Sequence, residues 1–131
     1  MELEIVEEQE SIQRRRDIKV KVEVEVNVNL LSSNGIIPMK PSCVGHIKDI
    51  SASGLFFVAP MFLKIGQEFS FVFPETSPPL PLTARIIRNQ KVDAAHLGYG
   101  CMFVYRNLTD EEVLRQYVFR KQVEQRRRER G

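Results

Sequence analysis

The sequence predicts a mainly β fold, a small six-stranded antiparallel barrel or sandwich, followed by a C-terminal α-helix. Six segments rich in β-branched and aromatic residues are separated by turn-forming residues at regular spacing, which is typical of such folds. Near the C-terminus the apolar residues change from a period of two to helical spacing. With 131 residues, 43% of them hydrophobic, the chain is long enough for one domain with its own core.

The first strand is predicted over residues 19–29, where apolar and polar side chains alternate without a break. Valine occupies every second position from Val20 to Val28, and charged or amide residues fill the positions between. This period predicts a strand that is buried on one face and solvated on the other. The SSNG sequence that follows predicts a turn, and Pro38 and Pro41 predict an irregular loop.

Five further segments complete the predicted sheet. They are residues 42–51, 55–59, 69–73, 82–90 and 97–105. We expect Val44 and Ile47 to contact the core from the first of these, and the alternating phenylalanines of the third to share one face. The proline-rich segment 74–81 is expected to be a loop.

A C-terminal helix is predicted over about residues 109–128. Thr109 followed by Glu112 is a capping-box pattern, and acidic residues suit the first turn of a helix. An apolar stripe at helical spacing follows, formed by Val113, Leu114, Tyr117 and Val118. We expect this stripe to pack on the sheet. Phe119 and Val123 lie off the centre of this stripe. We expect them to stay exposed and to mediate weak homodimerisation or the docking of a partner.

The distribution of charge excludes a general polyanion binder but leaves local basic segments. The net charge is only +2, with an acidic segment at 1–10 and basic segments at 14–16 and 126–130. No signal-peptide pattern opens the sequence, and no apolar run approaches the roughly 20 residues that span a bilayer. We therefore expect a cytoplasmic protein with reduced Cys43 and Cys101, while a disulfide between them stays open.

The sequence carries no recognisable catalytic or metal-binding motif. His46 and His96 are isolated from other candidate metal ligands, and the two cysteines form no C-x-x-C pair. Neither a phosphate-binding P-loop nor a nucleophile elbow is present. The glycines of the GYG segment 98–100 are expected to mark a bulge or a close backbone approach. We predict that the protein is not an enzyme and has no catalytic residue, metal ligand or cofactor.

Three arginines shortly before the first predicted strand are one candidate for ligand binding. Arg14, Arg15 and Arg16 precede the alternating valines. A guanidinium group offers paired donors to phosphate oxygens, and its plane stacks on nucleobases. Such a triplet is also typical of a solvated tail.

The DISASG segment, residues 49–54, is the other candidate. In a strand, Asp49 and Ser51 would point to the same face, and Gly54 permits a sharp turn or the close approach of a ligand. Taken alone, the same pattern is common in turns that end a strand.

Together the two segments resemble the motifs of the PilZ domain family. The family's first motif is R-x-x-x-R at the start of the first strand, and here Arg15 matches the first arginine while Lys19 stands in place of the second. The family's second motif is [D/N]-x-S-x-x-G, which DISASG matches in full. The resemblance covers about residues 13–128. It implies a PilZ-like β-barrel with a closing helix, in a single domain at residues 13–131 preceded by an arm at residues 1–12.

The resemblance further implies a receptor for the bacterial second messenger cyclic di-GMP. Such a receptor relays its signal through a protein partner that controls motility, exopolysaccharide or biofilm formation, and the sequence does not name that partner. The implied ligand-binding residues are Arg14, Arg15, Arg16, Lys19, Asp49, Ser51 and Gly54. In this assignment the arginines hold phosphates and stack on guanines, the Asp and Ser bond a guanine or orient an arginine, and the glycine leaves room.

Lys19 is the one departure from the family pattern. Lysine keeps the positive charge but loses the planar fork of arginine. A charge-assisted hydrogen bond contributes roughly 1.5–3 kcal/mol, so its loss would weaken binding about tenfold to a hundredfold. Arg14 lies directly before the motif, and in the family a basic residue there accompanies binding of a stacked ligand pair.

Two other functions stay open at this point. The first is an interaction module with the PilZ fold that does not bind the nucleotide, which Lys19 favours. The second is a small barrel that binds single-stranded nucleic acid through its basic ends. The second is disfavoured because no aromatic residue interleaves with the arginines.

Overall fold

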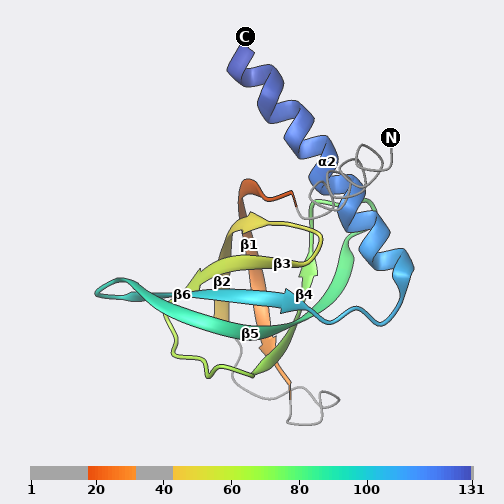
Figure 1. The fold of residues 1–131 in the computed structure, drawn as a ribbon. Coiled ribbons are helices and arrows are strands. Elements are labelled where there is room, and N and C mark those ends of the chain that lie inside the picture. The colour runs from red at the N-terminus through yellow and green to blue at the C-terminus, as the bar shows by residue number, and fades with distance from the viewer. Residues whose placement is uncertain (1–17, 32–42, 131) are drawn as a thin grey trace, which may run out of the picture.

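A computed structural model describes residues 18–31 and 43–130 (Figure 1). Its elements are β1 (Val20–Leu30), β2 (Cys43–Ile50), β3 (Gly54–Ala59), β4 (Glu68–Phe73), β5 (Leu80–Asp93), β6 (His96–Phe103) and α2 (Leu108–Arg130). The predicted set of six antiparallel strands followed by a helix is confirmed. The predicted arm at residues 1–12, the arginines 14–16 and the predicted turn and prolines within 32–42 lie outside the described residues.

The six strands form a closed barrel in the order β1-β2-β3-β6-β5-β4. The closing pair is short, because β1 joins β4 only through two residue pairs near the end of β1. Over most of its length β1 pairs with β2 alone. A seam therefore opens between the first part of β1 and the end of β4.

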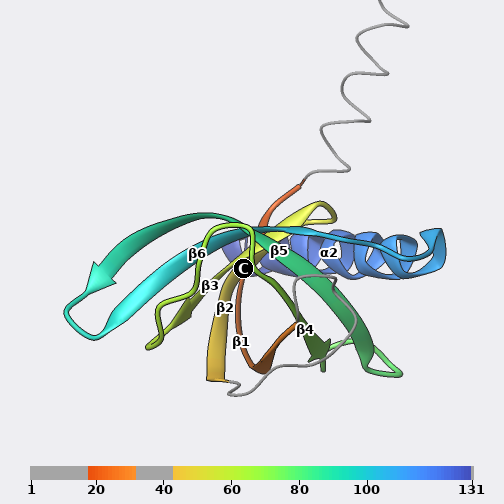
Figure 2. The same ribbon diagram turned by 90° about the horizontal axis from the view of Figure 1, so that it is seen from below.

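Helix α2 covers this seam. Tyr117 of α2 packs edge-on against Phe73 of β4, with 4.9 Å between ring centroids. Further along α2, the Gln125 side chain donates a hydrogen bond of 2.7 Å to the main-chain oxygen of Lys21 in β1. In Figure 1 α2 passes along one side of the barrel, and its C-terminal part extends beyond the strands. The view from below in Figure 2 shows the helix lying across the barrel on that same side.

The core confirms both predicted periodicities. The alternating residues Phe69, Phe71 and Phe73 are no more than 2% exposed. From the helical stripe, Leu114 is 0% and Val118 3% exposed. Burying an aliphatic side chain contributes about 1.5–3 kcal/mol, so the stripe binds α2 firmly to the barrel. Val113 and Val123 are half-buried, whereas Phe119 is 58% exposed.

The expectation that Val44 contacts the core is wrong. Val44 is 42% exposed, while its neighbour Gly45 is buried and Ile47 is fully buried. The period of two places residues 45 and 47 inside. Glycine is at the inner position because a Cβ atom there would come within 2.9 Å of the Phe57 ring.

The boundaries of β5 also differ from the prediction. The strand begins at Leu80, inside the segment 74–81 that was expected to be a loop, and includes Pro81. Proline is tolerated there because β6 pairs with β5 only from Ala84 onward, so the missing N–H removes no ladder bond on that side. At its other end β5 continues to Asp93, and the β5–β6 hairpin projects from the barrel (Figure 1).

The capping box at Thr109 and Glu112 is not formed. The helix begins one residue earlier, at Leu108, and the side-chain oxygen of Asn107 accepts a hydrogen bond of 2.9 Å from the main-chain N–H of Asp110. Asparagine is among the most favourable N-cap residues. The acidic first turn is confirmed and complements the helix dipole.

Candidate functional site

The pairing of β1 with β2 brings Lys19, the last residue of the first sequence motif, close to the second motif. Val20 lies opposite Ile50, and Lys21 lies opposite Asp49. Lys19 directly precedes β1 and is exposed, so the segment that carries the basic motif enters the barrel beside the end of β2. Ile18 packs against the core and fixes this entry point. Residues 14–16 lie outside the described part of the chain, so their contacts remain a prediction.

Asp49 lies on the outer face of the barrel because of an irregularity in β2. The register with β3 shifts between Ile47 and Asp49, which leaves Lys48 as an extra residue. Both Lys48 and Asp49 therefore point outward, while Ile50 is fully buried. The Lys48 ammonium pairs with Glu23 across the β1–β2 ladder. Asp49 has no hydrogen-bond or ion-pair partner within residues 18–31 and 43–130, so its carboxylate is available to a ligand.

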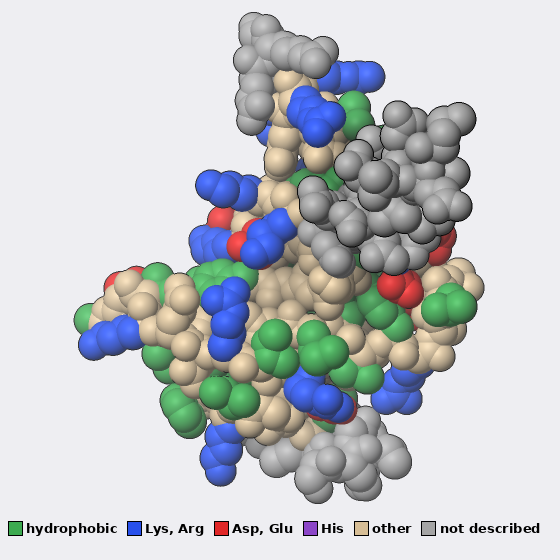
Figure 3. All heavy atoms as spheres, in the orientation of Figure 1, with side chains coloured by type: hydrophobic (Ala, Val, Ile, Leu, Met, Phe, Trp, Pro, Cys, Tyr) green, Lys and Arg blue, Asp and Glu red, His purple; other side chains and the backbone are tan. Residues whose placement is uncertain are grey.

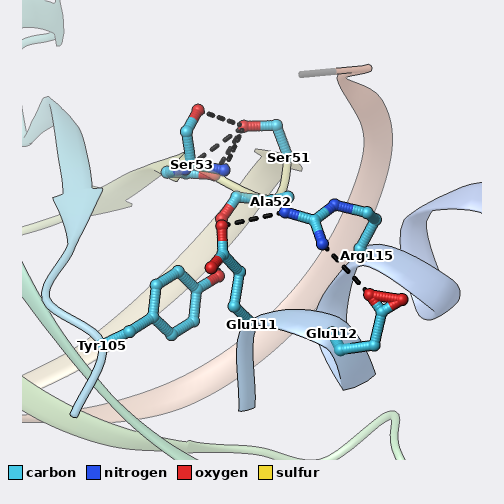
Figure 4. A network of polar contacts seen from close by, with 8 residues as sticks. Ser51, Ala52, Ser53, Tyr105, Glu111, Glu112 and Arg115 are labelled. Atoms are coloured by element: carbon cyan, nitrogen blue, oxygen red, sulfur yellow. Dashed lines mark hydrogen bonds and ion pairs between the residues drawn. The ribbon is translucent and has the colours of Figure 1, made fainter. Parts of the chain in front are cut away.

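Ser51 does not share a strand face with Asp49, contrary to the expectation from spacing. It lies just beyond the end of β2 and is 7% exposed. Its hydroxyl oxygen accepts hydrogen bonds from the main-chain N–H groups of Ser53 (3.3 Å) and Gly54 (3.2 Å). The Ser51 N–H in turn donates to the Gly54 oxygen at 2.8 Å. Ser51 thus holds the turn between β2 and β3, and Figure 4 shows its hydroxyl facing that of Ser53.

Gly54 has a structural reason to be glycine. A Cβ atom at this position would lie 2.1 Å from the main-chain oxygen of Cys101 in β6. Its backbone has no positive φ angle. The space that was expected to admit a ligand is therefore occupied by the neighbouring strand, and Gly54 permits the β3–β6 contact.

A second set of contacts joins this turn to the start of α2. The Tyr105 hydroxyl donates a hydrogen bond to the main-chain oxygen of Ala52. Burial raises the pKa of the Tyr105 phenol, with a further contribution from Glu111, so the hydroxyl keeps its proton. Figure 4 shows Tyr105 and Arg115 beside the turn, with Arg115 donating to Glu111 at 2.9 Å and to Glu112 at 3.1 Å.

The second half of α2 adds basic side chains near the entry of β1. A shallow hollow of about 330 Å³ lies between β1 and the helix. It is lined in part by Lys21, Lys121, Gln125 and Arg128. Lys21 and Gln125 are 104 residues apart in sequence, and the contact between β1 and α2 brings them together. A larger hollow of about 490 Å³ over β4 and β5 is lined by none of the motif residues.

At the GYG segment side chains, rather than the predicted close backbone, approach the glycines. A Cβ atom at Gly98 would come within 2.3 Å of the Phe56 ring, and one at Gly100 within 2.5 Å of Arg88 Nε. Phe56 and Arg88 point outward from the barrel in register with Asp49, although nothing in the sequence pattern singles them out. Their positions depend on strand register, which spacing alone does not give.

Groups suited to catalysis are not assembled in the described parts of the chain. No cluster of three or more His, Cys, Asp or Glu side chains there is arranged to hold a metal ion. Cys43 and Cys101 are free, and burial raises the pKa of both thiols, that of Cys101 to about 12. Neither is therefore an activated nucleophile. No helix of the described chain is long and apolar enough to cross a membrane.

His96 is not isolated, which corrects the sequence-based expectation. Its Nδ1 lies 2.9 Å from Oδ1 of Asp93 across the tip of the β5–β6 hairpin. A hydrogen bond from the Ala95 N–H, together with His96, lowers the pKa of the Asp93 carboxyl. The pair is exposed and stabilises the hairpin turn.

Comparison with known proteins agrees with the fold. Residues 13–120 match the PilZ domain family. The PilZ domain of YcgR from Escherichia coli, solved with c-di-GMP, has a TM-score of 0.66 and 15% identity over 91% of this chain and 99% of that domain. The Bacillus subtilis inhibitor of motility (MotI/DgrA) has a TM-score of 0.67 and 17% identity, covering 87% of this chain.

Several of these relatives are longer than the chain described here. The match covers 54% of the B. subtilis protein. It covers 50% of K. pneumonia MrkH in its apo state, which is 14% identical with a TM-score of 0.66 over 85% of this chain. No curated protein sequence matches significantly. Because the family match spans residues 13–120 and includes both sequence motifs, this chain belongs to the PilZ domain family.

Proposed function

We propose that this chain is a cyclic di-GMP receptor that relays ligand binding to a protein partner. PilZ domains bind cyclic di-GMP as a regulatory ligand, and the YcgR domain of similar fold was solved with it. The observation that carries the proposal is the β1–β2 register. It sets Lys21 opposite Asp49, with Lys19, the last residue of the basic motif, just before β1, and this supports a site formed by both motifs.

The roles of the binding residues follow from this arrangement. Arg14, Arg15 and Arg16 would hold the phosphates and stack on the guanines, because guanidinium groups do both. Lys19 and Lys21 would add positive charge where the segment joins the barrel. The free carboxylate of Asp49 would accept hydrogen bonds from a guanine edge or orient an arginine.

Ser51 and Gly54 would contribute mainly through the turn. The Ser51 hydroxyl is engaged by main-chain N–H groups, and Gly54 faces Cys101. These two residues would fix the backbone at which the ligand binds. Residues 13–131 would act as one cytoplasmic domain, with residues 1–12 as an arm.

Isothermal titration calorimetry with cyclic di-GMP tests the proposal. The wild-type chain should bind, and Arg15→Ala should lose at least about a hundredfold in affinity, because it removes a charged fork that contacts phosphate. An unchanged circular dichroism spectrum of the variant would show that the fold persists. Absence of binding by the wild-type chain would refute the receptor function.

An interaction module that does not bind the nucleotide is the second candidate. Lys19 in place of the second arginine favours it, and so does Phe119, which is 58% exposed on α2. In this function α2 would dock a partner protein or a second copy. Single-stranded nucleic acid is less favoured, since most strand phenylalanines are buried and cannot stack on bases. Titration with a single-stranded oligonucleotide beside cyclic di-GMP separates the three functions.

A further inference from the structure

One row of outward-facing residues runs around the barrel across five strands and includes Asp49. Successive register partners in this row are Lys21, Asp49, Phe56, Gly100 and Arg88. Neighbouring strands lie about 4.8 Å apart, so Arg88 is about 14 Å from Asp49 when measured along the curved surface of the barrel. The row thus leads from the proposed site toward β5.

The Arg88 side chain extends back along this row toward Asp49. A Cβ atom at Gly100 would come within 2.5 Å of Arg88 Nε, 2.8 Å of Cγ and 3.1 Å of Cζ. The guanidinium group therefore lies over β6, one strand nearer to Asp49, at about 10 Å from it along the barrel surface. Gly100 has no positive φ angle, so its lack of a side chain serves to admit Arg88.

No neighbouring acidic group in the described residues neutralises Arg88. Arg88 has no ion-pair partner in the described residues, in contrast to Arg85 on the same strand. Arg85 donates to Oε2 of Glu68 from Nε at 3.2 Å and from Nη2 at 2.7 Å. Figure 3 views the face formed by β3, β6 and β5, where Lys and Arg side chains are spread more widely than acidic ones.

Phe56 provides an apolar surface between the two charged residues. It is half-buried in β3, and its ring leans over Gly98 of β6, where a Cβ atom would come within 2.3 Å. An aromatic ring beside an unpaired guanidinium suits a nucleobase, because bases stack on aromatic rings and on arginine planes.

We propose that Arg88 is a further ligand-binding residue, whose planar guanidinium stacks on one guanine base of the bound dinucleotide beside Phe56. The proposal rests on the cyclic di-GMP binding proposed above. The two guanines of the ligand would then have different environments. One lies at the basic segment and Asp49, and the other lies over β6, within reach of Arg88.

Calorimetry on a matched set of variants tests this contact. Arg88→Ala should weaken cyclic di-GMP binding by roughly tenfold to a hundredfold, the range expected from the loss of one stacked base. Arg88→Lys should lose nearly as much, because lysine keeps the charge but not the plane. The control Arg85→Ala, on the same strand and face, should change affinity less than about twofold, since its guanidinium is engaged by Glu68.

Gly100→Ala tests the position of the guanidinium without removing it. The added Cβ would displace only the flexible Arg88 side chain, so the melting temperature should hold while affinity falls as in Arg88→Ala. The double variant should bind no more weakly than either single variant, because both remove one contact.

The possible results distinguish failure of the proposed function from failure of the Arg88 contact. If the wild-type chain does not bind, the proposed function fails. If it binds and Arg88→Ala binds equally well, this inference is overturned while the proposed function stands. Full affinity in Arg88→Lys would assign the contact to charge alone and overturn the stacking. Full affinity in Gly100→Ala would overturn the placement over β6.

Discussion

Ser51 and Asp49 belong to the same motif, but the structure assigns them different physical roles that mutation can separate. The Ser51 hydroxyl accepts two main-chain N–H groups and is 7% exposed. Ser51→Ala leaves both groups without this acceptor. An unsatisfied polar group costs about 1–3 kcal/mol when buried, and partial access to water reduces this to about 1–2 kcal/mol here.

This loss should be visible in thermal unfolding. For a chain of this size, 1 kcal/mol shifts the melting temperature by about 3–5 °C, so Ser51→Ala should melt about 3–10 °C lower. Asp49 has no partner within the described residues, and Asp49→Ala should stay within about 0.5 kcal/mol of wild type. Ser53→Ala is the control, because Ser53 is exposed in the same turn and its hydroxyl contacts only that of Ser51.

The affinity for cyclic di-GMP should fall in Asp49→Ala although its melting temperature does not. Asp49→Ala should lose about tenfold to a hundredfold in affinity for cyclic di-GMP, since a charge-assisted hydrogen bond is removed. Ser51→Ala should lose affinity together with stability. The assigned roles are wrong if Asp49→Ala lowers the melting temperature as much as Ser51→Ala does, or if Ser51→Ala leaves it unchanged.

Three further predictions concern the basic segment and the helix. Lys19→Arg should strengthen cyclic di-GMP binding by about tenfold in calorimetry, because it restores the fork; equal or weaker binding would mean that Lys19 does not occupy the second arginine's place. The wild-type chain should bind two ligands, and Arg14→Leu should reduce the ratio toward one; a wild-type ratio of one at saturation contradicts this. Leu114→Ala should cost about 2–5 kcal/mol of unfolding free energy, because Leu114 is 0% exposed, whereas Phe119→Ala should cost little. Equal melting temperatures for these two variants would show that α2 is not part of the core.

The sequence predicted those parts of the fold in which one face of an element is buried along its whole length. The phenylalanines of β4 and the stripe of α2 repeat at the period of their element, and burial follows from that period. Val44 was wrongly predicted to contact the core. The inward-facing position is taken by Gly45, which has no apolar side chain to mark it as buried in the sequence. The start of β5 was missed because proline is disfavoured in a paired strand but tolerated where β6 does not reach.

The sequence predicted only part of the candidate site. The motif residues could be named, but their mutual placement depends on register and on the extra residue at Lys48, which turns Asp49 outward. Arg88 is aligned with Asp49 only through strand pairing, and Arg128 comes near Lys21 only through the β1–α2 contact. No local pattern in the sequence encodes these long-range contacts.

Only part of the DISASG motif helps to distinguish a cyclic di-GMP receptor from an interaction module. Ser51 and Gly54 are required by the turn and by the β3–β6 contact whether or not a ligand binds. A barrel that serves only as an interaction module would need them equally, so their presence does not favour the receptor over the module. Asp49 and Arg88 have no such structural task in the described chain, and an unpaired charge gives the barrel no stability of its own. Variants of these two residues should therefore leave the fold intact in both cases, and only a receptor would lose affinity for cyclic di-GMP.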